Sequence, residues 1–79
     1  MLDLRGTIAL LLPNETIGLQ IAHLRKERKL SQAKLAAIAG LYPKYLSDVE
    51  TGRKVPRMDT VARLAAALGV TIEELCGMR

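Results

Sequence analysis

Apolar residues recur at the spacing of an α-helix along most of this chain. The first clear case is Ile17, Ile21 and Leu24, which lie at positions i, i+4 and i+7 and therefore share one face of a helix. Asn14 or Thr16 can cap the start of this helix, and basic residues fill its last turn. The pattern therefore predicts an amphipathic first helix that ends near residue 28.

Capping residues mark two short helices in the middle of the chain. Ser31 is a favourable N-cap, and Gly40 can adopt the left-handed conformation that ends a helix, so a helix of about two turns is expected between them. Pro43 suits the first position of the next helix, in which Leu46 and Val49 form a narrow apolar seam. This third helix is expected to be amphipathic and mostly exposed.

Two further helices are expected towards the end of the chain. Pro56 disfavours helical geometry at the residue before it, so a basic loop precedes the fourth helix, and Gly69 ends that helix. Its buried stripe consists of Val61, Leu64, Ala65 and Leu68. Thr71 and Glu74 have the spacing of a capping box, which predicts a last short helix through about Cys76.

Composition supports an all-α domain. The 79 residues suffice for one domain only, and their 49% hydrophobic and 25% charged content is typical of a globular chain. Two tyrosines and the absence of Phe and Trp favour helices packed through small residues over an aromatic-rich β-sandwich. We therefore expect a compact five-helix domain over residues 14–79, preceded by a short apolar arm.

The arm, residues 1–13, is harder to assign to an element. It shows no helical period, and its apolar run over residues 8–12 fits a short strand or a helical turn. A helical core of about 60 residues can fold without the arm, so the arm must pack on its own domain or meet another subunit. One hypothesis is that it supports dimerisation by strand pairing or exchange. The alternative is packing across the first and last helices.

Positive charge is concentrated in the middle of the chain. The net charge is +4, and nine of the 12 basic residues lie within residues 25–57, beside three of the eight acidic residues. A localised basic region favours binding to a polyanion, because neutralised phosphates release their counterions. A solvated lysine-rich face is the alternative, and charge alone does not separate the two.

The sequence offers no set of residues for catalysis or metal binding. The single cysteine, Cys76, is typical of a small buried residue, and the single histidine, His23, has no partner at ligand spacing. No nucleophile, base and orienting residue can be assembled from them, so neither an enzyme nor a cofactor is expected. The longest apolar run is five residues, too short to span a bilayer, and the expected location is the cytoplasm.

The second and third expected helices have the arrangement of a helix-turn-helix, which places its second helix in the DNA major groove. The basic centre of the chain coincides with them. Here the sequence closely resembles the Cro-like phage-repressor family of helix-turn-helix domains, also called the XRE family. The resemblance covers residues 17–75 and rests on LSQAKLAAIAG at 30–40, YLSDVETGRKVP at 45–56 and MDTVARLAAALGVTIEEL at 58–75.

This resemblance implies a lambda-repressor-like fold in which the third helix contacts bases. It also implies that Gln32 hydrogen-bonds a DNA phosphate, and that Arg25 and Glu50 form a structural ion pair between the first and third helices. One position departs from the family pattern, because Tyr42 stands where Ser or Thr usually caps the third helix. The start of that helix must therefore use water or a phosphate contact.

The outward face of the third helix is expected to contact base edges. The apolar seam of this helix faces the core. Its outward face therefore consists of the residues at positions i, i+3, i+4 and i+7, counted from residue 44. These are Lys44, Ser47, Asp48 and Thr51. Lys44 can donate to guanine, whereas Asp48 can only accept, which favours a cytosine amino group. Because an anion near phosphates disfavours non-specific binding, Asp48→Asn is expected to tighten such binding and to relax operator choice.

Residues around the third helix are expected to position it by contacts to phosphates. Arg57, just after Pro56, can instead enter the minor groove. The hydroxyls of Tyr42 and Tyr45 can donate to phosphates, or their rings can pack against the second helix. The residues expected to contact DNA are Gln32, Lys34, Tyr42, Pro43, Lys44, Tyr45, Ser47, Asp48, Thr51, Arg53, Lys54 and Arg57.

Together these features predict a sequence-specific DNA-binding transcriptional regulator. A domain of this type needs two half-sites about 34 Å apart, so we expect a homodimer that binds a palindromic operator and represses by occlusion. The alternative from another class is an antitoxin-type component of a toxin-antitoxin pair, which neutralises a protein partner and binds DNA secondarily. A controller of restriction-modification genes, which activates as well as represses, is also compatible with the size of the chain.

Overall fold

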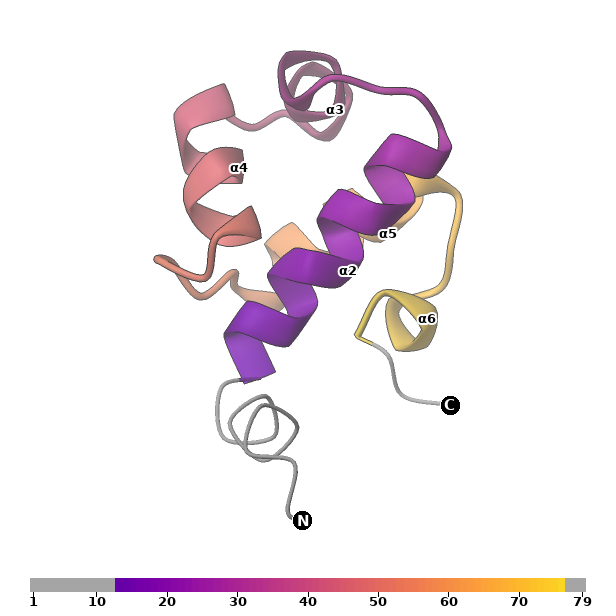
Figure 1. Ribbon diagram of the computed structural model, residues 1–79. Coiled ribbons are helices and arrows are strands. Elements are labelled where there is room, and N and C mark those ends of the chain that lie inside the picture. The colour runs from indigo at the N-terminus through magenta and orange to yellow at the C-terminus, as the bar shows by residue number, and fades with distance from the viewer. Residues whose placement is uncertain (1–12, 77–79) are drawn as a thin grey trace, which may run out of the picture.

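The computed structural model describes the backbone of residues 13–76 and the side chains of residues 17–76. Within this range the chain forms five helices and no strand, which confirms the all-α expectation (Figure 1). In chain order they are α2 (Pro13–Glu27), α3 (Gln32–Ala39), α4 (Pro43–Glu50), α5 (Met58–Leu68) and α6 (Ile72–Cys76). The predictions made for residues 1–12, including dimerisation through the arm, lie outside the described residues.

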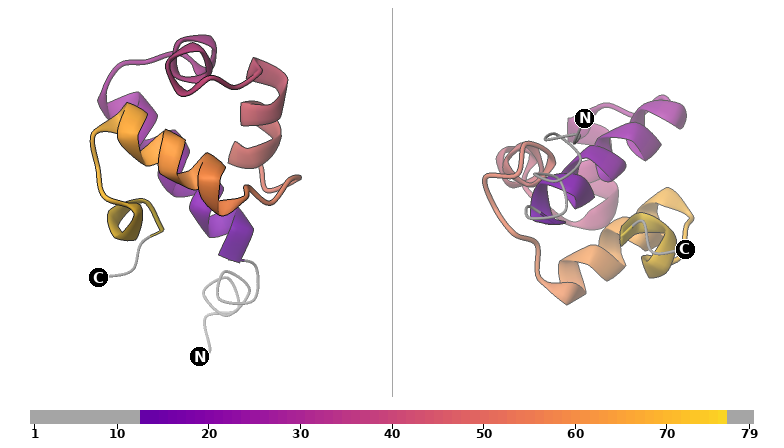
Figure 2. Two further views of the ribbon diagram at one scale, coloured as in Figure 1. Left: turned by 180° about the vertical axis from the view of Figure 1, so that it is seen from behind. Right: turned by 60° about the horizontal axis from the view of Figure 1, so that its bottom comes forward.

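Helix α2 lies across the middle of the domain. It packs against α4, α5 and α6, while α3 packs against α4 and α5. Figure 1 shows α2 in front of α5, with α4 to its left and α3 above it, and Figure 2 shows the same arrangement from behind. The largest fully buried side chains are Ile21, Leu35, Leu46, Val49, Leu64 and Leu75. Each of the described helices therefore contributes to one core.

Helix α2 begins earlier than its apolar pattern predicts. Its first residue is Pro13, so Asn14 and Thr16 lie inside the helix. The prediction that one of these two residues is the N-cap is therefore wrong. A helix can begin at proline because the N–H that proline lacks has no partner in the first turn. Pro13, which the pattern assigns to the arm, therefore belongs to α2.

The other expected helix caps are present. The Ser31 hydroxyl accepts a hydrogen bond of 3.0 Å from the backbone N–H three residues later. Gly40 and Gly69 adopt left-handed conformations, with φ of 73° and 74°. The Thr71 N–H donates to Glu74 Oε1 at 2.9 Å, and the Glu74 N–H donates to Thr71 Oγ1 at 3.0 Å, as in a capping box. Local chemistry thus sets these helix ends where the sequence predicts them.

Helix α2 approaches the backbone of α4 closely at Gly18. A Cβ atom on this residue would lie 2.7 Å from the carbonyl oxygen of Glu50 and would also meet the carbonyl oxygen of Val49. Backbone atoms cannot move aside as the end of a flexible side chain can. The packing of α2 on α4 therefore depends on the missing side chain at Gly18, which the apolar pattern does not predict.

Candidate nucleic-acid interface

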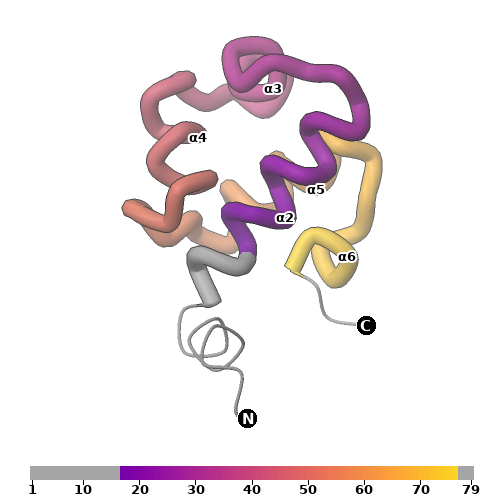
Figure 3. The backbone as a smooth tube through the Cα atoms, in the orientation of Figure 1, coloured from indigo at the N-terminus to yellow at the C-terminus, as the bar shows by residue number. Residues whose placement is uncertain are grey.

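A tight turn joins α3 to α4. Gly40 ends α3, and the backbone N–H of Leu41 donates to the carbonyl oxygen of Ala36 at 2.8 Å. Figure 3 shows the backbone turning here between the two helices. Leu46 and Val49 then anchor α4 in the core. The two helices and their turn have the helix-turn-helix arrangement expected from the sequence.

Helix α4 is more buried than its pattern predicts. Leu46 and Val49 face the core as expected, but Asp48 and Glu50 are also buried. A short helix that packs against both α2 and α3 keeps only a narrow accessible stripe. The expectation that this helix is mostly exposed is therefore wrong.

The accessible stripe holds three of the four residues expected on the outward face. Lys44 and Thr51 are exposed, and Ser47 is half-buried. Asp48 is buried, with a side chain 8% exposed, and its carbonyl oxygen accepts the backbone N–H of Arg53 at 2.8 Å. The chain therefore folds back beside Asp48 after α4. Asp48 shares the face of Lys44 as predicted, but the expectation that it is accessible there is wrong.

The carboxylate of Asp48 lies beside two cations. Its Oδ1 atom is 3.4 Å from Lys44 Nζ and 3.8 Å from Arg53 Nη1. Neither contact was predicted from the sequence. The i, i+4 spacing of Lys44 and Asp48 is a signal that could have predicted the first contact, whereas no local spacing predicts the second.

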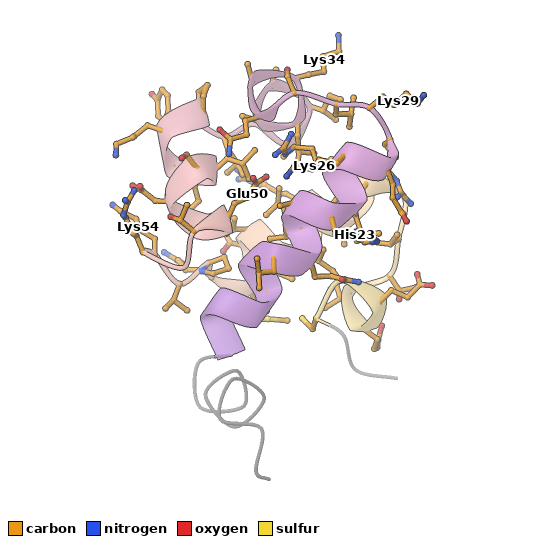
Figure 4. The ribbon with its side chains drawn as sticks, in the orientation of Figure 1. His23, Lys26, Lys29, Lys34, Glu50 and Lys54 are labelled. Atoms are coloured by element: carbon orange, nitrogen blue, oxygen red, sulfur yellow. The ribbon has the colours of Figure 1, made fainter. Side chains whose placement is uncertain are left out.

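The buried side chain of Glu50, on α4, connects three helices. Its carboxylate accepts from Arg25 on α2, with Nε to Oε2 at 2.8 Å and Nη2 to Oε1 at 3.1 Å. The ion pair implied by the family resemblance is thus present, and its side chains are 11% and 5% exposed. Gln32, the first residue of α3, donates from Nε2 to Glu50 Oε1 at 2.9 Å. Figure 4 shows Glu50 in the space between α4 and α2.

The bond between Gln32 and Glu50 was not expected from the sequence. It uses one of the two amide protons of Gln32 inside the protein. The phosphate contact implied for this residue remains a prediction, and the second amide proton would have to make it.

The two tyrosines near α4 differ in their surroundings. Tyr42 is 82% exposed and makes no side-chain hydrogen bond at the start of the helix, consistent with the departure from the family pattern. Tyr45 is half-buried and packs against the core. The ring of Tyr45 therefore packs within the domain, whereas the hydroxyl of Tyr42 is accessible to a phosphate. The phosphate contact of either tyrosine remains a prediction.

The basic residues beside α4 are accessible. Lys34 on α3 and Lys54 after α4 both point into solvent in Figure 4, and Arg53 is exposed as well. Arg57 is also exposed, and its Nε lies 3.5 Å from Asp59 Oδ1. These cations can therefore reach phosphates, although their contacts to DNA remain predictions.

The two remaining candidates for a metal site, His23 and Cys76, belong to no such site within the described residues. His23 is exposed and lies 3.1 Å from Glu27 Oε2, and Cys76 is half-buried against the core. Within residues 13–76, no group of three His, Cys, Asp or Glu residues could hold a metal ion. No helix in that part of the chain has the length and apolar character needed to cross a membrane.

A helix-turn-helix with an accessible polar stripe and exposed cations beside it is the arrangement of a DNA-binding domain. The family model described as Helix-turn-helix matches residues 21–75, a range that contains α3, α4 and α5. The chain therefore belongs to the helix-turn-helix family, of the Cro-like phage-repressor or XRE type, and it carries a DNA-binding domain of the kind found in transcriptional regulators.

Relatives with known sequences include regulators from a phage and a bacterium. The chain is 42% identical over 62 residues to the immunity repressor protein of Bacillus phage phi105, covering 78% of this chain and 43% of the repressor. It is 42% identical over 59 residues to the uncharacterized HTH-type transcriptional regulator y4dJ of Sinorhizobium fredii, covering 75% and 77% of the two chains. The chain thus spans less than half the length of the phage repressor.

Solved structures share this arrangement of helices. The restriction-modification controller protein C.AhdI from Aeromonas hydrophila superposes with a TM-score of 0.77 at 32% identity, covering 78% of this chain and 94% of the controller. The clp gene regulator ClgR from C. glutamicum superposes with a TM-score of 0.80 at 27% identity, covering 85% and 87% of the two chains. These likenesses confirm the helical fold expected from the sequence.

Proposed function

We propose that this protein is a transcriptional regulator that binds a palindromic operator as a homodimer and represses transcription by occluding it. The accessible stripe of α4 is the observation that carries the proposal, because its polar residues can reach base edges in a major groove. A phage relative named as an immunity repressor supports repression over activation.

The proposed contacts divide into two kinds. Lys44, Ser47 and Thr51 contact bases, and the hydroxyl of Thr51 already donates to the carbonyl oxygen of Ser47 at 3.0 Å, so Thr51 acts through its acceptor lone pairs. Phosphate contacts hold the helix in register without reading sequence. They are assigned to Gln32, Lys34, Tyr42, Arg53, Lys54 and Arg57.

The test of this function is selection of bound duplexes from a random pool. The expected result is an inverted repeat whose half-sites lie about 34 Å apart, together with a steep loss of affinity as salt rises. A pool without any enriched sequence would contradict operator binding. Copurification with a second protein at a fixed ratio would instead favour the antitoxin-type alternative.

Substitutions on α4 and beyond its end should have different effects on binding. Lys44→Gln is expected to change the base preferred at one position of the half-site, because an amide that both donates and accepts replaces the cationic donor to guanine, which costs about 1–3 kcal/mol there. Lys54→Gln is expected to weaken all duplexes alike and to reduce the salt slope by about 1. Binding titrations with selected and unrelated duplexes measure both effects.

The control for charge is Arg63→Gln, which removes an exposed cation from α5 rather than from the vicinity of α4. It is expected to leave both the base preference and the salt slope close to those of the wild type. If Lys44→Gln prefers the same base as the wild type at every position of the half-site, contact of Lys44 with a base would be contradicted.

Dimerisation is proposed to depend on the segment before α2. Deletion of residues 1–12, which leaves Pro13 as the start of the helix, is expected to convert the dimer to a monomer in analytical ultracentrifugation. Circular dichroism should show the same helical signal per residue of the remaining domain. A truncated chain that still sediments as a dimer would reject this role and favour packing of the segment on its own domain.

A further inference from the structure

Asp48 is a buried carboxylate that meets two exposed cations. Its side chain is 8% exposed, whereas those of Lys44 and Arg53 are 81% and 69% exposed. Both cations approach the same oxygen, Oδ1, at 3.4 and 3.8 Å. These separations exceed the roughly 2.7–2.9 Å of a tight charge-assisted hydrogen bond. The carboxylate therefore attracts both side chains without locking them in place.

The two cations reach Asp48 from opposite ends of α4. Lys44 is the second residue of the helix, and Arg53 follows its end. The carbonyl oxygen of Asp48 also accepts the backbone N–H groups of Arg53 at 2.8 Å and of Lys54 at 3.2 Å. Asp48 is therefore fixed within the protein, while both cations lie at the ends of long, exposed side chains.

We propose that Asp48 is a positioning residue for DNA binding, which holds Lys44 and Arg53 beside α4 until a duplex draws them away. This inference rests on the proposed function of α4. A phosphate oxygen or a guanine edge competes with Oδ1 for each cation, and both cations can reach it because they are exposed and lie 3.4 and 3.8 Å from Oδ1. Once the cations leave, the carboxylate stays in place beside α4 without them.

The consequence is a bias against unmatched DNA. At a matched site, Lys44 gains a contact to guanine that offsets the loss of its contact to Asp48. At an unmatched site, which offers Lys44 no guanine, only a phosphate contact replaces the contact of Lys44 to Asp48. The negative charge of Asp48 meanwhile repels the DNA backbone. Asp48 thus acts on specificity through its two neighbours and does not contact a base.

The experiment is a salt titration of binding to a duplex of about 30 base pairs of arbitrary sequence, with the full chain as wild type and as Asp48→Asn. The amide keeps the size of the side chain and removes its charge. In the wild type, the attraction of Asp48 opposes the transfer of Lys44 and Arg53 to phosphates. Its removal is therefore expected to steepen the slope of log K against log salt by about 1, and to tighten binding about tenfold at about 0.1 M KCl.

Glu73→Gln is the matched control, because it changes the net charge by the same amount at an exposed position of α6. Its slope is expected to equal that of the wild type. An unchanged slope in Asp48→Asn, or equal changes in the two variants, would overturn the inference. A wild type that binds no duplex at all would overturn the proposed function, so the two failures can be told apart.

A triple variant tests whether the two cations carry the effect. Adding Lys44→Gln and Arg53→Gln to Asp48→Asn is expected to abolish the gain in slope. A measurement on the wild type does not depend on the folding of any variant: the carbon-13 resonance of the Asp48 carboxyl group should shift when the duplex is added, because the cations leave it. A resonance that stays in place would overturn the inference.

Discussion

Replacement of Glu50 by alanine is expected to lower the free energy of unfolding by about 3–5 kcal/mol. The substitution leaves the buried guanidinium of Arg25 without the carboxylate that accepts two of its N–H groups. It also removes the acceptor of Gln32 on α3. A domain of this size has a stability near the low end of about 5–15 kcal/mol, so much of it is lost. Urea unfolding followed by circular dichroism measures the change.

The control for this prediction removes both partners of the ion pair. Arg25→Met combined with Glu50→Leu fills the same space with apolar side chains, and buried pairs replaced in this way are often neutral or stabilising. The double variant is therefore expected to be more stable than Glu50→Ala, although it lacks more polar contacts. Equal losses in the two variants would show that an unpaired buried charge is not the cause.

Gly18→Ala is expected to lower the free energy of unfolding by about 1–3 kcal/mol. In an exposed helix the same change would stabilise by about 1 kcal/mol, because alanine favours the helix more than glycine does. Here the new Cβ would lie 2.7 Å from the carbonyl oxygen of Glu50, so α2 and α4 must move apart. Thermal unfolding followed by circular dichroism measures the loss.

Gly69→Ala provides the comparison for Gly18→Ala. A Cβ on Gly69 would have no atom within 4 Å, but the residue has a left-handed φ of 74°. The substitution of Gly69 therefore tests backbone conformation alone. It is expected to lower the free energy of unfolding by about 1–2 kcal/mol. If Gly18→Ala were as stable as the wild type, the close approach of α2 to α4 would not limit the packing.

The parts of the fold that depend on neighbouring residues could be predicted from the sequence. Ser31, Gly40 and the pair of Thr71 and Glu74 act within one turn of the helix that they begin or end, so their spacing reveals their role. The apolar spacing of α4 likewise identified Leu46 and Val49 as buried. One structural contact across the chain, the ion pair of Arg25 and Glu50, was expected only because the sequence resembles a known family.

The burial of Asp48 could not be predicted in the same way. Its helical position sets its direction relative to Leu46, but its exposure depends on the loop that follows α4 and folds back beside it. The bond between Gln32 and Glu50 joins residues 18 positions apart and has no local spacing to reveal it. Both features depend on how helices and loops pack together, and the periodicity of one helix does not predict that packing.

The three-way connection at Glu50 also determines which molecule adapts on binding. Because one carboxylate bonds to α2 and α3 at once, a pivot of α4 by itself to follow a groove of a different shape would break these bonds. The duplex must then supply the deformation, by bending, twisting or changing its groove width. Base steps that deform easily will be preferred even at positions that no side chain touches.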